Sequence, residues 1–159
     1  MALSPPAPDD EVFMFEALTE ARKALEHDDV PVGAVVTMND EVIARARNER
    51  ELRKDPTAHA EILVLRAAAA AMGDRHLVGT TVYVTIEPCP MCAGALMLSR
   101  ARRLVFGAAD PRAGAALSLY NIVGDARLNH QLEVTPDVLA DESAELMRAF
   151  FEQRRGQVR

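Results

Sequence analysis

The sequence predicts a three-layer α/β fold, because segments with strand character alternate with segments of helical spacing along the chain. Its 159 residues suit one ordinary domain with a core of its own. Hydrophobic residues make up 49% and charged residues 26% of the chain, values typical of a globular protein. We expect residues 1–10 to form a disordered N-terminal arm and residues 11–159 to form a single domain.

The first third of the chain is expected to supply a helix and a hairpin. Apolar residues recur at helical spacing across residues 11–27, which predicts an amphipathic helix. Two short strands, 31–38 and 41–47, are separated by Asn39 and Asp40, residues that favour a tight turn. These two strands are therefore predicted to pair with each other.

The middle of the chain alternates between loop, helix and strand. Residues 48–57 are polar and loop-like, and a helix should follow through the alanine-rich segment to about Met72. Residues 80–86 are rich in β-branched side chains, which predicts a buried strand. A second helix is expected to begin after Cys89.

The last third is predicted to contain two further strands and a terminal helix. The strands fall at residues 102–108 and 131–135, with a long loop between them that contains one helical turn at 116–123. The terminal helix is expected over residues 136–155, with Pro136 in its first turn.

Composition excludes some classes of protein and leaves others open. The chain has no run of eighteen apolar residues and no signal-like N-terminus, so we expect a cytoplasmic protein without a membrane partner. The formal net charge is −6, but the first 43 residues carry −8 and the remainder +2. Charge alone therefore neither establishes nor excludes an RNA partner.

His59, Cys89 and Cys92 are the candidate metal ligands. The chain has two cysteines, three positions apart, which indicates metal or redox chemistry rather than a disulfide scaffold. Zinc favours imidazole and thiolate ligands, and a catalytic zinc site keeps one coordination position open for water. Three protein ligands leave that position open, so we expect one Zn²⁺ in each subunit.

Glu61 is the candidate catalytic residue. It follows His59 by two positions, and at the first turn of a helix both side chains can border one pocket. There a carboxylate can take a proton from zinc-bound water and return it to a leaving group. His-x-Glu and Cys-x-x-Cys are each common alone, and the second also has a redox interpretation. Together, with a proline before the first cysteine, they match the pattern of the zinc deaminases.

Longer segments resemble the bacterial tRNA-specific adenosine deaminases of the cytidine-deaminase-like superfamily, from about residue 12 to residue 155. The resemblance implies a mixed five-stranded sheet, a homodimer, and hydrolytic conversion of adenosine to inosine at wobble position 34 of tRNA, with an arginine tRNA of anticodon ACG as substrate. In that reaction a zinc-bound hydroxide attacks C6, Glu61 carries the proton and ammonia leaves. The matching segments are DVPVGAVV, DPTAHAEILVLR, TTVYVTIEPCPMCAGALMLSR, RLVFGAADPRAGA and LADESAELMRAFFEQRR.

The same resemblance implies a set of substrate contacts. Asn48 matches an asparagine that hydrogen-bonds the target base, and Asp110 matches an aspartate that faces the RNA backbone. On the terminal helix, an aromatic residue is expected to border the RNA while arginines meet phosphate, although adjacent phenylalanines usually pack in a core. The remaining positions, which comprise the pocket walls and these helix residues, are Pro31, Val32, Ile86, the backbone of Ala60, Phe150, Phe151, Arg154 and Arg155.

Two positions depart from the family pattern, and two other functions stay open. Ala109 replaces a longer or charged residue, and Leu117 replaces a frequent glycine, which puts the local backbone in doubt. A free-base or nucleoside deaminase acting on guanine or cytosine would share the zinc motif. A non-catalytic, zinc-stabilised RNA-binding module would need a fourth ligand rather than the proton carrier Glu61.

Overall fold

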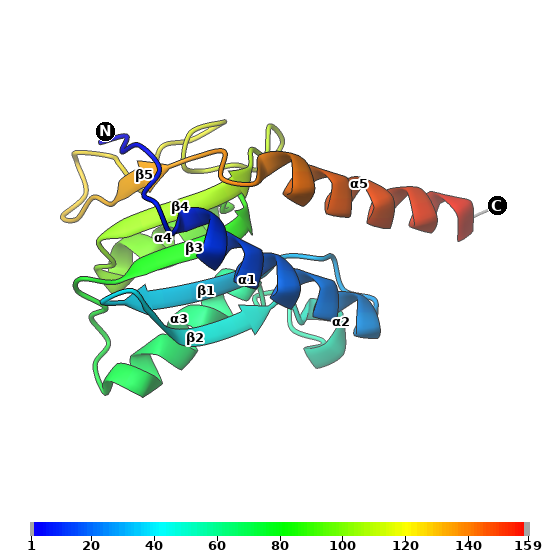
Figure 1. The fold of residues 1–159 in the computed structure, drawn as a ribbon, viewed down its shortest axis with the longest axis horizontal. Coiled ribbons are helices and arrows are strands. Elements are labelled where there is room, and N and C mark those ends of the chain that lie inside the picture. The colour runs from blue at the N-terminus through cyan, green and yellow to red at the C-terminus, as the bar shows by residue number, and fades with distance from the viewer. Residues whose placement is uncertain (1, 158–159) are drawn as a thin grey trace.

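The computed structural model describes residues 2–157, and its strands form one mixed five-stranded sheet (Figure 1). The strands are β1 (Gly33–Met38), β2 (Glu41–Arg47), β3 (Thr81–Ile86), β4 (Arg103–Ala108) and β5 (Glu133–Thr135). They lie in the order β2-β1-β3-β4-β5, with β1 antiparallel to both neighbours and β3, β4 and β5 parallel. The mixed five-stranded sheet is therefore confirmed.

Helices cover both faces of this sheet, which confirms the three-layer α/β architecture (Figure 1). They are α1 (Asp10–Lys23, continued by a 3-10 turn at Ala24–His27), α2 (Arg50–Arg53), α3 (Ala60–Met72), α4 (Pro90–Ser99) and α5 (Ala140–Gln157). Helices α1 and α5 pack on one face, and α3 and α4 on the other. No helix in the described part of the chain is long and apolar enough to span a membrane.

Alternation of side chains along the strands gives each face of the sheet its own core. Val35, Tyr83 and Val105 form a row across β1, β3 and β4, and they pack with Phe13 and Met14 of α1. The residues one position further along each strand are buried against α3 and α4 instead. Burying a side chain of this size stabilises the fold by about 1.5–3 kcal/mol, so both helical layers are firmly attached to the sheet.

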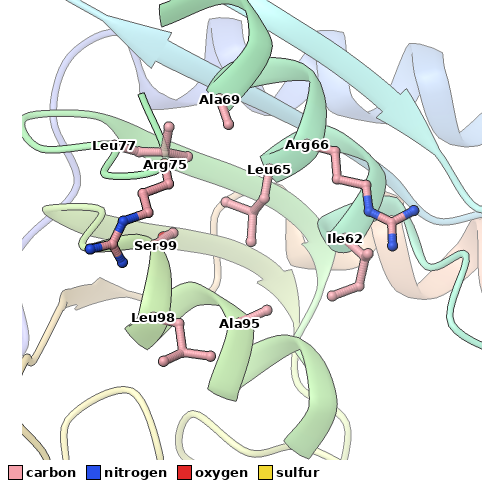
Figure 2. Close-up of a pocket in the computed structure, with 9 residues that line it drawn as sticks. All are labelled: Ile62, Leu65, Arg66, Ala69, Arg75, Leu77, Ala95, Leu98 and Ser99. Atoms are coloured by element: carbon pink, nitrogen blue, oxygen red, sulfur yellow. The ribbon is translucent and has the colours of Figure 1, made fainter. Parts of the chain in front are cut away.

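Helices α3 and α4 lie side by side and leave an apolar groove on their outer surface (Figure 2). Leu65 and Ala95 line the groove, and Leu98 is 69% exposed beside them. Arg66 and Arg75 border it on opposite sides (Figure 2). Apolar surface of this kind, rimmed by charge, is typical of an interaction site.

The N-terminal segment runs along β5 and is not the expected disordered arm. The Ser4 N–H donates to the Val134 carbonyl at 2.9 Å, and the Val134 N–H donates to the Ala2 carbonyl at the same distance. The hydroxyls of Ser4 and Thr135 are also hydrogen-bonded, at 2.8 Å. The expectation was wrong for residues 2–10 because β5 offers an edge with free backbone groups, which composition alone does not reveal.

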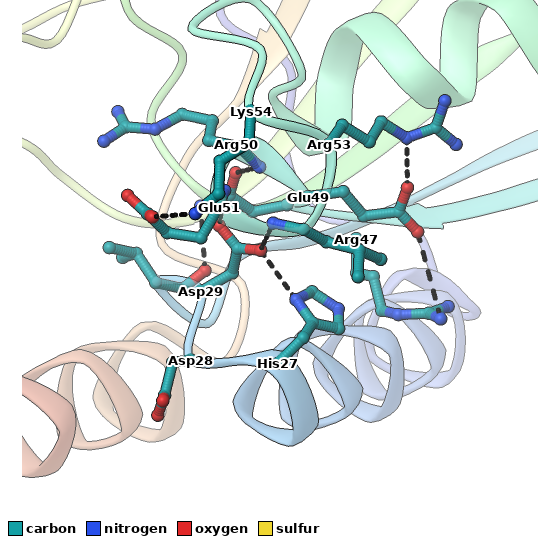
Figure 3. A network of polar contacts seen from close by, with 12 residues as sticks. His27, Asp28, Asp29, Arg47, Glu49, Arg50, Glu51, Arg53 and Lys54 are labelled. Carbon is teal, nitrogen blue, oxygen red and sulfur yellow. Dashed lines mark hydrogen bonds and ion pairs between the residues drawn. The ribbon is translucent and has the colours of Figure 1, made fainter.

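The short helix α2 occupies part of the segment predicted to be a loop. The N–H groups of Glu51 and Leu52 donate to the carboxylate of Asp29, at 2.7 and 3.1 Å (Figure 3). The same carboxylate lies 2.6 Å from Nδ1 of His27 (Figure 3). The group that caps this turn therefore comes from a residue 22 positions earlier, which local sequence does not indicate.

Two other local predictions were wrong. Residues 116–123 form turns and not a helical turn, because the N–H groups of residues 116–118 donate to the side chain of Glu87. The terminal helix begins at Ala140 rather than at Pro136. Asp137 and Leu139 have φ values of 65° and 51°, so the chain is in the left-handed region where an α-helix cannot start.

A buried ion pair joins α1 to the sheet. Asp10 is fully buried and accepts hydrogen bonds from Arg103 at 2.6 and 2.8 Å, from the Tyr83 hydroxyl at 2.8 Å and from the Ala7 N–H at 2.7 Å. Burial alone would raise the pKa of Asp10, but the hydrogen bonds from Arg103, Ala7 and Tyr83 hold it below its usual value. Arg103 also donates to Thr135, so this cluster connects α1, β3, β4 and β5.

We predict that Asp10→Asn lowers the free energy of unfolding by about 3–5 kcal/mol near pH 7, because the buried Arg103 charge loses its partner. Urea denaturation measures this loss. The matched control is Glu145→Gln, whose ion pair with Arg148 is exposed and should contribute less than about 1 kcal/mol.

The same pair has a pH dependence of defined sign. Since the pKa of Asp10 is lowered on folding, its contribution is complete above the ordinary value of 3.8 and is lost as pH falls through the lower folded value. Equal losses in Asp10→Asn and Glu145→Gln would contradict the assignment.

Candidate active site

The candidate metal ligands meet where α3 and α4 begin. His59 is the residue immediately before α3, and Cys89 is the residue immediately before α4. Pro90 occupies the first position of α4, where its fixed φ favours helix initiation, and Cys92 lies in the first turn. The chain thus enters both helices at one point, and one ligand atom from each residue lies within 4.8 Å of the others.

The distances within this cluster fit a tetrahedral zinc ion. Nδ1 of His59 lies 3.7 Å from Sγ of Cys89 and 3.5 Å from Sγ of Cys92. Zinc–nitrogen and zinc–sulfur bonds of about 2.05 and 2.3 Å, at a tetrahedral angle, separate nitrogen from sulfur by about 3.6 Å. Donor chemistry and spacing therefore agree, and the three residues can hold a metal ion.

The two thiols of the cluster differ in acidity. The hydrogen bond with Cys92 lowers the pKa of Cys89 to about 4, against the opposing effect of burial, and a hydrogen bond with His59 adds to the decrease. The same contact with Cys89, together with burial, raises the pKa of Cys92. Cys89 also lies at the N-terminus of α4, where the helix dipole favours a negative charge. Both effects favour the thiolate, the metal-binding form of cysteine, at Cys89.

Glu61 lies beside this cluster and is only 4% exposed. Burial raises the pKa of the Glu61 carboxyl, and a hydrogen bond with Cys92 opposes the increase. A carboxyl group whose pKa is moved toward neutrality is suited to accepting and returning a proton. The predicted proximity of Glu61 and His59 is therefore found in the structure.

Both residues line a cavity of about 350 Å³ together with most of the predicted substrate contacts. The predicted residues on its wall are Val32, Asn48, His59, Ala60, Glu61, Ile86, Cys89, Asp110 and Phe151. Residues that line it but were not identified as site residues from the sequence are Val30, Arg50, Glu87, Ala113 and Met147. Two of these, Arg50 and Glu87, are charged. Their place on the cavity wall follows from the fold and from no local sequence pattern.

Four predicted contacts do not line the cavity, namely Pro31, Phe150, Arg154 and Arg155. Phe150 is 6% exposed, whereas the adjacent Phe151 is 44% exposed and lines the cavity. Successive helical residues point about 100° apart, so only one of the two can face the cavity. The Arg154 guanidinium lies 4.7 Å from the centre of the Phe150 ring and donates to the Asp28 carbonyl, which holds α5 against that loop.

Asn48 is fixed in place by both ends of its side-chain amide. Its Nδ2 donates to the Val30 carbonyl at 3.1 Å, and its Oδ1 accepts from the Arg50 N–H at 3.2 Å. An amide has two N–H groups and two acceptor lone pairs, so one donor and one acceptor site remain for a ligand.

The loop after β4 is shaped by Asp110. Its Oδ1 accepts hydrogen bonds from the N–H groups of Arg112 and Ala113, at 3.0 and 3.2 Å. Leu117 is not among the described residues with positive φ, and its N–H donates to Glu87 at 2.9 Å, so this position does not require glycine. Ala109 is exposed, next to Asp110.

Comparison with known proteins agrees with this geometry. The family model described as MafB19-like deaminase matches residues 8–155. A tRNA-specific adenosine deaminase of Bacillus subtilis (strain 168) is 50% identical, covering 92% of this chain and 91% of its own length. One from Agrobacterium fabrum is 46% identical, covering 90% and 94%. The chain belongs to the tRNA-specific adenosine deaminases. It is therefore an enzyme.

Solved structures support the assignment of this deaminase. One from a study of A-to-I editing by tRNA:A34 deaminases superposes with a TM-score of 0.82 at 45% identity, covering 85% of this chain and 98% of that one. A guanine deaminase of Nitrosomonas europaea superposes with a TM-score of 0.77 at 27% identity, covering 94% and 86%. The fold is thus shared with free-base deaminases, whereas sequence identity is higher to the tRNA enzyme.

We predict that Cys89→Ala in this deaminase reduces zinc from about one ion per chain to a small fraction, since two protein ligands remain. Elemental analysis of purified, dialysed protein measures the change. His76→Ala, at a half-buried histidine in the loop after α3, is the control and should keep its zinc. Full zinc content in the Cys89 variant would contradict the ligand set.

Proposed function

We propose that this deaminase hydrolyses the 6-amino group of adenosine at wobble position 34 of tRNA, giving inosine and ammonia, with an arginine tRNA of anticodon ACG as substrate. The observation that carries the proposal is that Glu61 lines one cavity together with His59 and Cys89, two members of the metal-ligand cluster. The names of its relatives support the substrate class. We also propose that residues 11–159 act as one catalytic domain, in the cytoplasm where tRNA is modified.

We assign the metal as one Zn²⁺ per chain, held by His59, Cys89 and Cys92. The distances between their ligand atoms and the nitrogen–sulfur donor set both support zinc. When bound, zinc lowers the pKa of water toward 7 and so supplies a nucleophile at neutral pH. Three protein ligands leave a coordination position for that water, which distinguishes a catalytic site from a structural one.

Glu61 is assigned to proton transfer. Its carboxylate accepts a proton from the attacking water and delivers a proton to N6 of the adenine as oxygen bonds to C6. The C6–N6 bond then breaks, ammonia leaves, and the ring carries oxygen at C6. Burial of Glu61 at the edge of the cavity supports this role, because a poorly solvated carboxylate binds a proton more readily.

The walls of the cavity are assigned to binding the flipped base. Val32 and Ile86 supply apolar surface, and Asn48 retains one donor and one acceptor for the edge of the ring. The backbone of Ala60 lies on the wall between His59 and Glu61. A base in a single-stranded anticodon loop can enter such a cavity at modest cost, because it is not paired in a duplex.

The rim of the cavity is assigned to the RNA around the target. Phe151 is exposed at the rim and can stack on a neighbouring base, the role expected for one of the two adjacent phenylalanines. Arg50 lies on the same wall and can meet phosphate. Asp110 keeps one carboxylate oxygen that accepts no hydrogen bond from the described residues. Arg154 and Arg155 remain candidates for phosphate further along α5.

We propose that the deaminase is a homodimer whose subunits meet at the groove between α3 and α4 (Figure 2). A second copy is the favoured occupant because an apolar groove on a pair of helices can pack against itself across a two-fold axis. Leu98→Glu should convert the dimer to a monomer, whereas Leu119→Glu, at another exposed leucine, should not. Sedimentation equilibrium measures this, and a monomeric unmodified chain would rule the proposal out.

Two other functions are less well supported. A guanine or cytosine deaminase would use the same zinc motif, but it has no need of the exposed aromatic and basic residues at the rim. A non-catalytic zinc module would need a fourth protein ligand, and the ligand cluster found in residues 2–157 has three members. Glu61 lies close enough to be considered as a fourth metal ligand, but we assign it to proton transfer.

We predict that zinc-loaded protein forms inosine in an ACG anticodon stem-loop and leaves free adenosine, guanine and cytosine unchanged in parallel assays. Glu61→Ala should keep its zinc and lose about 10²–10⁴-fold in kcat, the usual contribution of general acid–base catalysis. Turnover of a free base with an untouched stem-loop would overturn the RNA assignment. Undiminished turnover by Glu61→Ala would overturn the proton-transfer role.

A further inference from the structure

Glu87 is a buried carboxylate with no cationic partner among residues 2–157. It follows directly after β3, two positions before Cys89, and is 1% exposed. None of the ion pairs formed within residues 2–157 includes it. An isolated buried charge is costly, so other groups must stabilise this one.

Those groups come from the loop after β4. One carboxylate oxygen, Oε2, accepts from the N–H groups of Ala116, Leu117 and Ser118, at 3.2, 2.9 and 2.9 Å. The other, Oε1, accepts from the Asp110 N–H at 3.2 Å and from the Ser118 hydroxyl. Hydrogen bonds to a charged acceptor are about twice as strong as neutral ones. Five donors from nine residues therefore fold this loop around a single side chain.

Two further features keep the loop close to Glu87. The Ala115 N–H donates to the Pro88 carbonyl at 2.8 Å, beside the metal-ligand segment. At Gly114, a Cβ would lie 2.4 Å from Oε2 of Glu87 and 2.5 Å from the Asp110 carbonyl, so a larger residue would push the loop away. The loop thus has one compact arrangement, with Glu87 at its centre.

Through Glu87, the segment that carries Cys89 is connected to the part of the cavity wall formed by the loop after β4. The loop carries Asp110 and Ala113, which both line the cavity, while Glu87 itself is separated from Cys89 by Pro88 alone. A shift of Glu87 would therefore move the wall without removing a ligand or the proton carrier.

We propose that Glu87 is a positioning residue that holds the loop of residues 110–118, and with it Asp110 and Ala113, in the conformation that binds the RNA-borne adenosine. The inference rests on the proposed function and adds a determinant of substrate binding to it. Glu87 takes no part in proton transfer, which belongs to Glu61.

Glu87→Gln tests this with little change in volume. The amide keeps one oxygen, which can face the three N–H groups of residues 116–118. Its NH₂ group then opposes the Asp110 N–H, because both are donors, while the Ser118 hydroxyl can turn to accept. The substitution therefore releases Asp110 selectively and leaves most of the loop attached.

We expect Glu87→Gln to raise KM for the ACG stem-loop by about tenfold. This is the lower end of the roughly 10–100-fold loss that follows removal of a hydrogen-bonding group that orients site residues. The zinc content and the shape of the pH profile of kcat should stay as in the unmodified enzyme. Ser118→Ala, which removes one donor, should raise KM in the same direction by a smaller factor. Glu133→Gln, the same chemical change at the start of β5, is the control and should leave KM unchanged.

Hydrogen exchange provides a readout that does not depend on activity. The Asp110 amide should exchange faster in Glu87→Gln than in the unmodified chain. Unchanged KM together with unchanged exchange would overturn the proposal. So would a loss confined to kcat with an altered pH profile, because Glu87 would then act in the chemistry. If the unmodified chain leaves the stem-loop untouched, the proposed function fails, and exchange at Asp110 still decides whether Glu87 holds the loop.

Discussion

The site depends on two helices that begin at the same place. Because α3 and α4 both start beside the end of β3, the residues that enter them bring an imidazole and two thiols within 4.8 Å of one another. A strand and two helix starts, each fixed by the hydrophobic layers on the sheet, set this geometry. The ligand distances that fit tetrahedral zinc are therefore a consequence of the fold.

Buried carboxylates hold the remaining parts of the molecule around that point. Asp10 joins α1 to the sheet through its ion pair with Arg103. Asp29 caps α2 near the cavity, and Glu87 accepts hydrogen bonds from the loop after β4. Each is 0–1% exposed, and each accepts hydrogen bonds from donors distant in sequence. A buried carboxylate with good donors specifies one arrangement, because any other leaves the charge unsatisfied. Two of the three lie next to the cavity wall.

The sequence predicted structure most reliably where the conformation is decided by residues close together in the chain. Alternating and helical spacing predicted the strands and the long helices, and ligand spacing predicted the cluster of His59, Cys89 and Cys92 with Glu61 beside it. It failed where distant groups decide the backbone. The cap of α2 comes from Asp29, and the N–H groups of residues 116–118 are taken by Glu87 instead of helical carbonyls. The choice of Phe151 over Phe150 at the cavity depends on the rotation of α5, which local sequence does not set.

We propose that His59, Cys89 and Cys92 bind a catalytic zinc with one position open to water. X-ray absorption at the zinc edge of the purified, unmodified protein measures this shell directly. We expect two sulfur atoms at about 2.3 Å and two nitrogen or oxygen atoms at about 2.0–2.1 Å, one of them exchangeable. A shell without sulfur, or a closed set of four protein ligands with no exchangeable oxygen, would contradict it.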